Sequence, residues 1–414
     1  MKKPSPTTAL TCALALSAAL ALTACSGPGP ATNATPDGPA TISILDWFSG
    51  DIDHEATQKV FDRCADAAGV KLDRQSIDGA NLVQRVLQQA STKTLPDILM
   101  IDHTDVPQIA AMGALRPLTD ADISSEGYAD GVVSSGMYQN KLYGLIPNTA
   151  TLSLFVNNAL LKEAGVTAPK TWDELKSTAA ALTHDGQYGL GFSAVADFQA
   201  TWQFLPFFWT NGADETDITS PEAVEALQLL TDLLKAGSVS NSVLNWTSGD
   251  VREQFVAGKA AMIVDGPWDI PVVKSEAPDL DWSIVLIPTK NASDTSVAPL
   301  GGEAWTLPAT SADPAHQAKA GEVLKCFLGD DSQISMGVAR ATIPGKTTLK
   351  DEYLKQMPDM ATFAQQVANA RSRTAKLGVD WPKTATALYQ AEQLALTGQM
   401  DPADALKSEA ANLG

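Results

Sequence analysis

The feature that most restricts the fold is an alternation of short apolar runs with helical patterns in the first hundred residues. Residues 41–45 and 96–102 are apolar runs of strand length, and residues 70–74 can form another strand. Between them, residues 53–69 and 81–90 carry apolar side chains at helical spacing. Strands and helices that alternate in this way form a parallel sheet with helices on both faces. The sequence therefore predicts an α/β lobe at this end of the chain.

Polar and aromatic side chains follow the ends of two of these strands. Asp46 and Trp47 come directly after the first strand, and Asp102 and His103 come at the end of the third. Ligands of open α/β sheets bind beyond the carboxyl ends of parallel strands. We therefore expect these four residues to lie at the rim of a binding cleft.

A second informative stretch begins at Phe255 and reads FVAGKAAMIVDGPW. Gly258 can adopt the left-handed conformation that closes a helix, and residues 260–264 are an apolar run of strand length. The Asp-Gly-Pro sequence that follows predicts a rigid turn, which would hold Trp268 in one direction. Trp268 can be a core residue at the end of a strand or an aromatic plate facing a cleft, and the stretch alone leaves both interpretations open.

This stretch resembles the GK-A-M-x-x-x-GPW segment of the extracellular solute-binding proteins (family 1) that feed carbohydrate ABC importers. Residues 137–157 resemble the family's GKLYGLP passage, with Asn140 where the family usually has Gly. The sequence TWDEL from Thr171 resembles a helix start of the family and has capping-box spacing, and residues 397–410 resemble its closing helix. These landmarks keep the family's order over nearly the whole mature chain.

The resemblance implies an α/β, type II periplasmic-binding-protein-like fold, in which two lobes, each a sheet flanked by helices, enclose a ligand cleft. We expect residues 41–149 and 290–329 to form the first lobe. Residues 150–289 and 330–414 are expected to form the second lobe.

The N-terminal segment has the features of a targeting signal. Two lysines precede an apolar run at residues 9–22, which is too short to span a bilayer comfortably. The sequence LTAC ending at Cys25 resembles a bacterial lipobox, so residues 1–24 are predicted to be a lipoprotein signal peptide and Cys25 the lipidated first residue. A plain secretory cleavage with an incidental Cys25 is the alternative. Residues 25–40, rich in small and polar residues, are predicted to be a flexible tether. The protein is then expected outside the cytoplasm, anchored to the cell membrane.

Of the four cysteines, Cys12 falls in the predicted signal peptide and Cys25 in the lipobox, which leaves Cys64 and Cys326. Two remaining cysteines often pair outside the cytoplasm. Both lie in helical patterns, so we predict a disulfide between them, with two buried free thiols as the alternative.

Length and charge exclude some classes of function. A chain of 414 residues is expected to form two or more domains. With 29 Lys and Arg against 48 Asp and Glu, the formal charge of −19 argues against a nucleic-acid partner. The sequence contains neither G-x-S-x-G nor H-E-x-x-H, and its histidines and acids show no metal-ligand spacing. We therefore expect neither an enzyme nor a bound cofactor or metal.

A sugar site needs two kinds of surface. A pyranose presents C–H groups on its faces and hydroxyls around its edge, so flat apolar side chains and fixed polar groups suit it. In the family a Gly-Gly loop contacts the sugar, and an Arg and an aromatic residue precede the last helices. Arg371 is a possible substitute for Arg373 in that passage. The predicted ligand-binding residues are Asp46, Trp47, Asp102, His103, Asn148, Trp268, Gly302, Glu303, Trp305, Arg373 and Trp381.

We therefore expect a monomeric two-lobed binding lipoprotein that captures a mono- or oligosaccharide and delivers it to the transmembrane permease of an ABC importer. The alternatives are a binding protein for another polar solute, such as glycerol phosphate, a cell-surface enzyme acting on glycosides, and an adhesin without a transport role.

Overall fold

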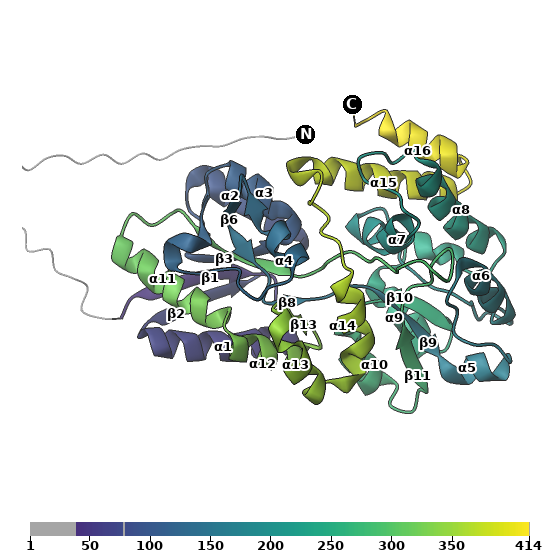
Figure 1. Cartoon of the computed structure of the whole chain (residues 1–414), viewed down its shortest axis with the longest axis horizontal. Coiled ribbons are helices and arrows are strands. Elements are labelled where there is room, and N and C mark those ends of the chain that lie inside the picture. Colours follow the sequence, from purple (N-terminus) through teal and green to yellow (C-terminus); the bar gives the residue numbers. More distant parts are fainter. Residues whose placement is uncertain (1–38, 78, 414) are drawn as a thin grey trace, which may run out of the picture. The chain divides into compact units, whose positions relative to one another are not determined.

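The computed structural model describes residues 39–77 and 79–413. The predicted signal peptide, Cys25 and all but the last two residues of the predicted tether lie outside the described residues. Between residues 39 and 413 the chain forms two lobes, each built on its own β-sheet (Figure 1). In the described part of the chain, none of the helices has the length and apolar character needed to cross a membrane.

The first lobe contains the predicted parallel strands. β1 pairs in parallel with both β2 and β3, because the helix after each strand brings the chain back to the end of the sheet at which that strand began. A later strand, β12, joins β3 in the antiparallel direction and places Glu303 opposite Asp102. β7 (Gly144–Leu145) pairs with β12 as well. In spatial order the sheet contains β2 (Lys71–Ser76), β1 (Thr41–Asp46), β3 (Ile98–Asp102), β12 (Glu303–Pro308) and β4 (Leu115–Arg116).

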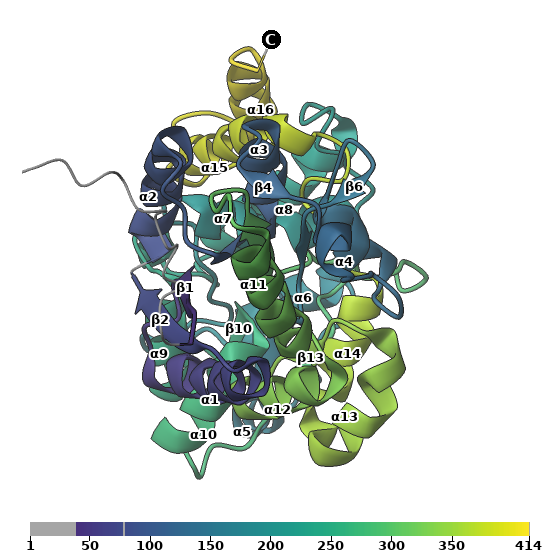
Figure 2. The ribbon, with the colours of Figure 1, turned by 90° about the vertical axis from the view of Figure 1, so that its left-hand side faces the viewer.

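The helices of this lobe cover the sheet, and α1 packs against both α11 and α12 (Figure 2). The predicted disulfide joins Cys64 of α1 to Cys326 of α11, with their Cα atoms 5.6 Å apart. Gly69 ends α1 with a φ of 67°, as its position in the helical pattern predicted. The helices are α1 (Asp51–Ala68), α2 (Gly79–Thr92), α3 (Val106–Ala111), α4 (Asp130–Ser135), α11 (Pro314–Phe327) and α12 (Asp330–Arg340).

The second lobe is built on three antiparallel strands with β9 in the centre. Successive side chains of a strand point to opposite faces, and here both faces are covered. Leu154 and Val156 of β9 join one hydrophobic core, whereas Phe155 between them joins another. The strands are β9 (Ser153–Asn157), β10 (Met262–Asp265) and β11 (Trp282–Val285).

Two helices of the second lobe begin at the predicted signals. Thr171 and Glu174 form the capping box of α6, and Ser220 caps α8 ahead of Pro221. Gly258 follows α9 with a φ of 68°. The helices are α5 (Asn158–Glu163), α6 (Trp172–Ala181), α7 (Phe198–Thr210), α8 (Pro221–Lys235), α9 (Ser248–Val256), α10 (Ile270–Glu276), α13 (Lys350–Gln356), α14 (Ala361–Ala368), α15 (Trp381–Leu396) and α16 (Pro402–Ala410).

Short extended segments connect the lobes and pair with one another. β8 (Asn148–Thr149) pairs with β13 (Ile343–Pro344), and Ala150 bridges to Gly301. These segments lie side by side, so residues that are far apart in the sequence meet at one place. Residues 330–340 form α12, which packs against α1 and α11 of the first lobe, although residues 330–414 were predicted to belong to the second. The exact division of the chain into the two lobes stays a prediction.

Candidate functional site

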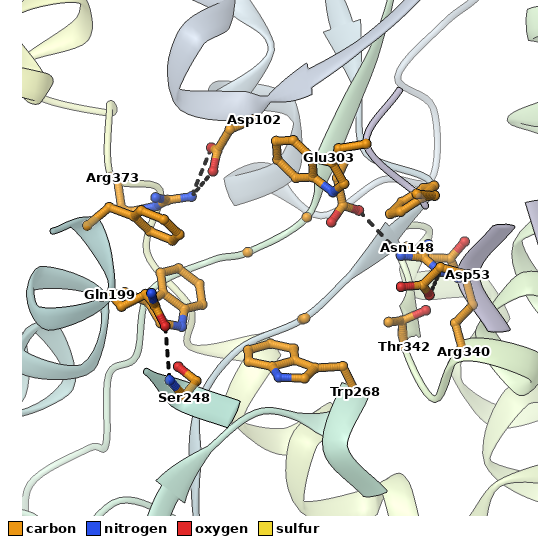
Figure 3. A pocket seen from close by; sticks show the side chains of 17 residues that line it. Asp53, Asp102, Asn148, Gln199, Ser248, Trp268, Glu303, Arg340, Thr342 and Arg373 are labelled. Carbon is orange, nitrogen blue, oxygen red and sulfur yellow. Dashed lines mark hydrogen bonds and ion pairs between the residues drawn. The ribbon is translucent and has the colours of Figure 1, made fainter. Parts of the chain in front are cut away.

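A cavity of about 310 Å³ lies between the two lobes, next to the connecting segments (Figure 3). Elements of both lobes line it: its wall combines side chains from the segment after β1 and from α1, β3 and β12 with others from α7, α9 and the turn after β10. Seven of the eleven predicted ligand-binding residues line it: Trp47, Asp102, Asn148, Trp268, Gly302, Glu303 and Arg373.

Asp46 does not line the cavity, and this part of the prediction is corrected. The side chain of Asp46 is fully buried, with Oδ2 2.6 Å from Nε of Arg74. Its Oδ1 accepts hydrogen bonds from the backbone N–H of Phe48 at 2.9 Å and from the Ser76 hydroxyl at 2.8 Å. Asp46 therefore fixes the chain that leaves β1, and the next residue, Trp47, faces the cavity.

Trp268 lies in the cavity wall, in a single helical turn that follows β10. A Cβ atom on Gly266 would stand 2.1 Å from the Trp268 indole, so only glycine lets the ring lie over this backbone. Gly266 has a φ of −108°, which any residue can adopt. The glycine is therefore required by the close approach of the ring, and not by an unusual backbone conformation, as the Asp-Gly-Pro sequence suggested. Asp269, next to Trp268, pairs with Arg252 at 3.0 Å and ties the turn to α9. Trp268 is half-buried, packing partly against the core of the second lobe.

The first turns of α7 bring further aromatic side chains to the cavity. Trp202 and Phe198 are four residues apart and so lie on the same side of this helix. Phe198 is 67% exposed, which is unusual for so large an apolar side chain. The same helix continues with Phe204, Phe207 and other rings that are buried in the core. The sequence run WQFLPFFW therefore contains one ring for the cavity and several for the core.

Arg373, which is buried, and Asp102, which is partly exposed, form an ion pair on one side of the cavity. One guanidinium nitrogen, Nη2, lies 2.9 and 3.0 Å from the two oxygens of Asp102, and the Trp202 ring lies 4.8 Å from the guanidinium carbon. Burial alone would raise the pKa of Asp102, but the charges of Arg373 and His103 together with hydrogen bonds lower it to about 2. Asp102 is therefore a carboxylate at every physiological pH.

His103 does not line the cavity either, because it is fully buried behind this pair. Its Nε2 lies 2.9 Å from the carbonyl oxygen of Leu300 and 3.2 Å from Nη2 of Arg373. Burial and the charge of Arg373 together lower the pKa of His103 to about 4, although Asp102 opposes the shift. The neutral imidazole can donate Nε2–H to the Leu300 carbonyl oxygen, and it does not line the cavity.

A second group of charges lies on the other side of the cavity. Arg340, at the end of α12, places Nε 2.6 Å from Asp53 Oδ1 and Nη2 3.7 Å from Glu303 Oε2. Its guanidinium also lies over the Phe48 ring at 4.1 Å. Burial raises the pKa of Glu303 to about 6, although Arg340 opposes the rise. Glu303 is therefore largely ionised at neutral pH and protonated in mild acid.

The structure distinguishes Arg373 from its alternative, Arg371. Arg371 lies 2.6 Å from Glu215 and 3.3 Å from Asp214, and its guanidinium stacks over Trp209. These contacts bind the irregular segment after α14 to the second lobe. Arg373, two residues further, is the one that lines the cavity.

Trp305 and Trp381 were predicted to be aromatic plates, and the structure places both in the core. Trp305 is 1% exposed and packs its ring against Phe61 and Phe327 at 5.1 and 4.6 Å. Trp381, at the start of α15, is 4% exposed within the core of the second lobe. Neither side chain can touch a molecule in the cavity without repacking of its lobe.

Several lining residues carried no signal that pointed to a site. Asp53 and Arg340 lie in helices α1 and α12, where charged side chains are usually solvated. Only the pairing of distant segments brings them beside Glu303. The other lining residues that were not predicted as ligand-binding are Phe48, Ala150, Phe198, Gln199, Trp202, Ser248, Gly301 and Thr342.

Comparisons with known proteins agree on one family. The sequence profile of a family described as bacterial extracellular solute-binding protein matches residues 59–365. A binding protein of Brucella abortus is 24% identical over 370 residues, which cover 86% of this chain and 88% of that protein. A maltooligosaccharide ABC transporter solute-binding lipoprotein of Streptococcus pneumoniae is 23% identical over 255 residues, 58% of this chain and 58% of that protein.

A solved structure has the same fold. The cyclic α-maltosyl-1,6-maltose binding protein from Arthrobacter globiformis matches this chain with a TM-score of 0.78 at 23% identity. The match covers 90% of this chain and 97% of that one. The two-lobed arrangement is therefore shared over almost the whole described part of the chain.

Proposed function

This chain belongs to the bacterial extracellular solute-binding proteins, and we propose that within this family it is the carbohydrate-binding component of an ABC import system. The predicted type II periplasmic-binding-protein-like fold is confirmed by the structural match. In the proposed role the cavity between the lobes holds a mono- or oligosaccharide, which the protein delivers to a membrane permease. Binding takes place without turnover.

The observation that carries this proposal is the combination of aromatic rings and fixed polar groups in one cavity. Trp47, Trp202 and Trp268 come from three separate elements of the two lobes and offer flat apolar faces. In the same wall, Asp102 and Glu303 present carboxylate oxygens from side chains that are 26% and 20% exposed. A molecule with apolar faces and a polar edge, as a pyranose has, matches both kinds of surface.

Two named proteins support the choice of ligand class and of partner. The pneumococcal relative is named for maltooligosaccharides and for an ABC transporter, and the solved structure is named for a cyclic maltose derivative. That relative is also named a lipoprotein, which supports a lipid on Cys25 in this chain. We therefore extend the proposal to a monomer outside the cytoplasm, anchored by Cys25 and acting with the transmembrane subunits of an importer.

Thermal unfolding with a panel of neutral mono- and oligosaccharides tests the proposed binding. At about a hundredfold excess over Kd, a ligand stabilises its protein by about 2.7 kcal/mol, which raises Tm by a few degrees. At least one saccharide is expected to do so. The variant Trp202→Ala should lose this shift, whereas Trp246→Ala, which removes a tryptophan outside the cavity lining, should keep it. If only phosphorylated compounds or metal ions raise Tm, the carbohydrate proposal is wrong.

Membrane fractionation tests the anchor separately. The mature protein should sediment with membranes, and Cys25→Ser should release it or leave the signal peptide uncleaved. Wild-type protein that is wholly soluble, with a free Cys25 thiol, would rule the anchor out and leave the binding proposal intact.

A further inference from the structure

The cavity wall contains more acidic than basic side chains. The lining contains the carboxyl groups of Asp53, Asp102 and Glu303 and the guanidinium groups of Arg340 and Arg373. With all of them ionised, the wall carries one negative charge in excess. The whole chain, at −19, adds a field of the same sign.

Each of the two arginines already has its own carboxylate. Arg373 holds both oxygens of Asp102 at 2.9 and 3.0 Å, and Arg340 holds Asp53 at 2.6 Å. Their free N–H groups can still donate to hydroxyls, but their charge is neutralised by the partner. A phosphate or carboxylate of a ligand would have to displace one of these carboxylates or be buried beside it, and a buried charge without a partner is costly.

Glu303 shares its nearest cation, Arg340, with Asp53, which holds Arg340 more closely. Its nearest guanidinium nitrogen, on Arg340, is 3.7 Å away, which is beyond hydrogen-bonding distance. No other residue in the described part of the chain donates a hydrogen bond to it. Its side chain is 20% exposed and points into the cavity (Figure 3). Asp53 and Asp102 on the neighbouring elements add negative charge, which raises its pKa together with burial.

We propose that this cavity selects saccharides without negative charge and that Glu303 makes it prefer an amine-bearing sugar to an acidic one of the same shape. The inference rests on the proposed carbohydrate function and narrows its ligand class. A protonated amine beside Glu303 would supply the third cation that the three carboxylates of the wall lack. A uronic acid or sugar phosphate would add a second uncompensated negative charge. The same reasoning disfavours glycerol phosphate as the ligand.

The test compares matched ligands by isothermal titration calorimetry at pH 7.5. The probes are the neutral saccharide with the largest thermal shift in the panel, starting with maltotriose, and two forms of it. In one form a terminal 6-hydroxyl is replaced by an amine, and in the other the same carbon is oxidised to a carboxylate. We expect the amine form to bind at least about tenfold more tightly than the carboxylate form, a factor of ten being 1.4 kcal/mol.

Two variants assign this preference to Glu303. Glu303→Gln should reduce the ratio of the two affinities to about threefold or less. Glu322→Gln changes the net charge equally on the exposed surface of α11, and it should keep the wild-type ratio. At pH 5 the wild-type ratio should also shrink, because Glu303 with a pKa of about 6 is then protonated.

Two results would overturn the inference alone: a carboxylate form that binds as tightly as the amine form, or a Glu303→Gln variant that keeps the full wild-type ratio. If no neutral saccharide binds at all, the proposed carbohydrate function falls as well. These failures are distinguishable because the neutral parent sugar is measured first.

Discussion

Replacing Gly266 by alanine should displace the Trp268 ring without deleting it. The added methyl carbon would stand 2.1 Å from two ring atoms and 2.4 Å from a third, far inside the 3.4 Å of ordinary contact. Gly266 has φ −108° and ψ 170°, which alanine adopts without strain, so this clash is the source of the effect. Overpacking of this kind costs about 1–3 kcal/mol of folding free energy when the ring cannot move away.

If Trp268 is a main aromatic contact for the ligand, its displacement should weaken binding about as much as its truncation. Loss of a buried aromatic anchor typically costs about 2 kcal/mol or more, roughly thirtyfold in Kd. Trp268→Ala should lower the unfolding free energy by less than the 3–5 kcal/mol typical of a fully buried tryptophan, because Trp268 is only half-buried.

A double-mutant cycle separates these effects by calorimetric affinity and denaturant unfolding. In Gly266→Ala/Trp268→Ala the clash has no partner, so the loss of affinity should equal that of Trp268→Ala alone, and the stability cost of Gly266→Ala should vanish. Strictly additive losses in both measurements would refute the reasoning. Normal sugar binding by Trp268→Ala, together with a large loss of stability, would show that Trp268 serves the core.

Three further predictions concern charge and covalent structure. The pKa of Glu303 is raised to about 6, so its protonated form stabilises the folded state below pH 4.5, and this contribution is lost as pH rises through 6. Glu303→Gln should therefore remove up to about 2 kcal/mol of the loss of folding free energy between pH 4 and 7, and less than this because the side chain is partly exposed. Identical curves of stability against pH for variant and wild type would contradict this. Cys64→Ser/Cys326→Ser should cost about 2–5 kcal/mol in denaturant unfolding, since the bond closes a loop of 262 residues, and an unchanged midpoint would show that packing alone holds α1 on α11. Arg74→Ala leaves Asp46 buried without its cation and should cost about 3–5 kcal/mol, whereas Arg74→Ala combined with Asp46→Ala should recover part of it; equal losses in both would argue against the ion pair.

The elements that the sequence predicted well are those with local signals. The strands and helices up to Asp102 follow from apolar spacing, and the caps at Thr171 and Ser220 follow from residue types a few positions apart. The antiparallel insertion of β12 between β3 and β4 has no such signal, because it depends on a pairing between segments about two hundred residues apart.

The errors at the site have a common physical cause. A position at the end of a strand indicates that a residue is near the cleft, but not which way its side chain points. Asp46, the last residue of β1, turns inward to Arg74, whereas Trp47, just beyond the strand, reaches the cavity. Depth along the strand matters as well. Glu303 and Trp305 are two positions apart in β12, but only Glu303, the first residue of the strand, lines the cavity, whereas Trp305 is buried in the core.

The two lobes contribute different kinds of side chain to the cavity, and most of the charged ones come from the first lobe. Side chains from α7, α9 and the turn after β10 are uncharged: Phe198, Gln199, Trp202, Ser248 and Trp268. The carboxylates lie on α1, β3 and β12 of the first lobe, and Arg340 is on α12 beside them. The second lobe thus presents mainly flat apolar surface, which can accept the faces of many sugars at similar cost. Discrimination between charged and neutral sugars must therefore come from the first lobe together with Arg373, and substitutions on the two walls should affect affinity in different ways. Changes to the aromatic wall should weaken all ligands together, whereas changes to the charged wall should alter which ligand binds.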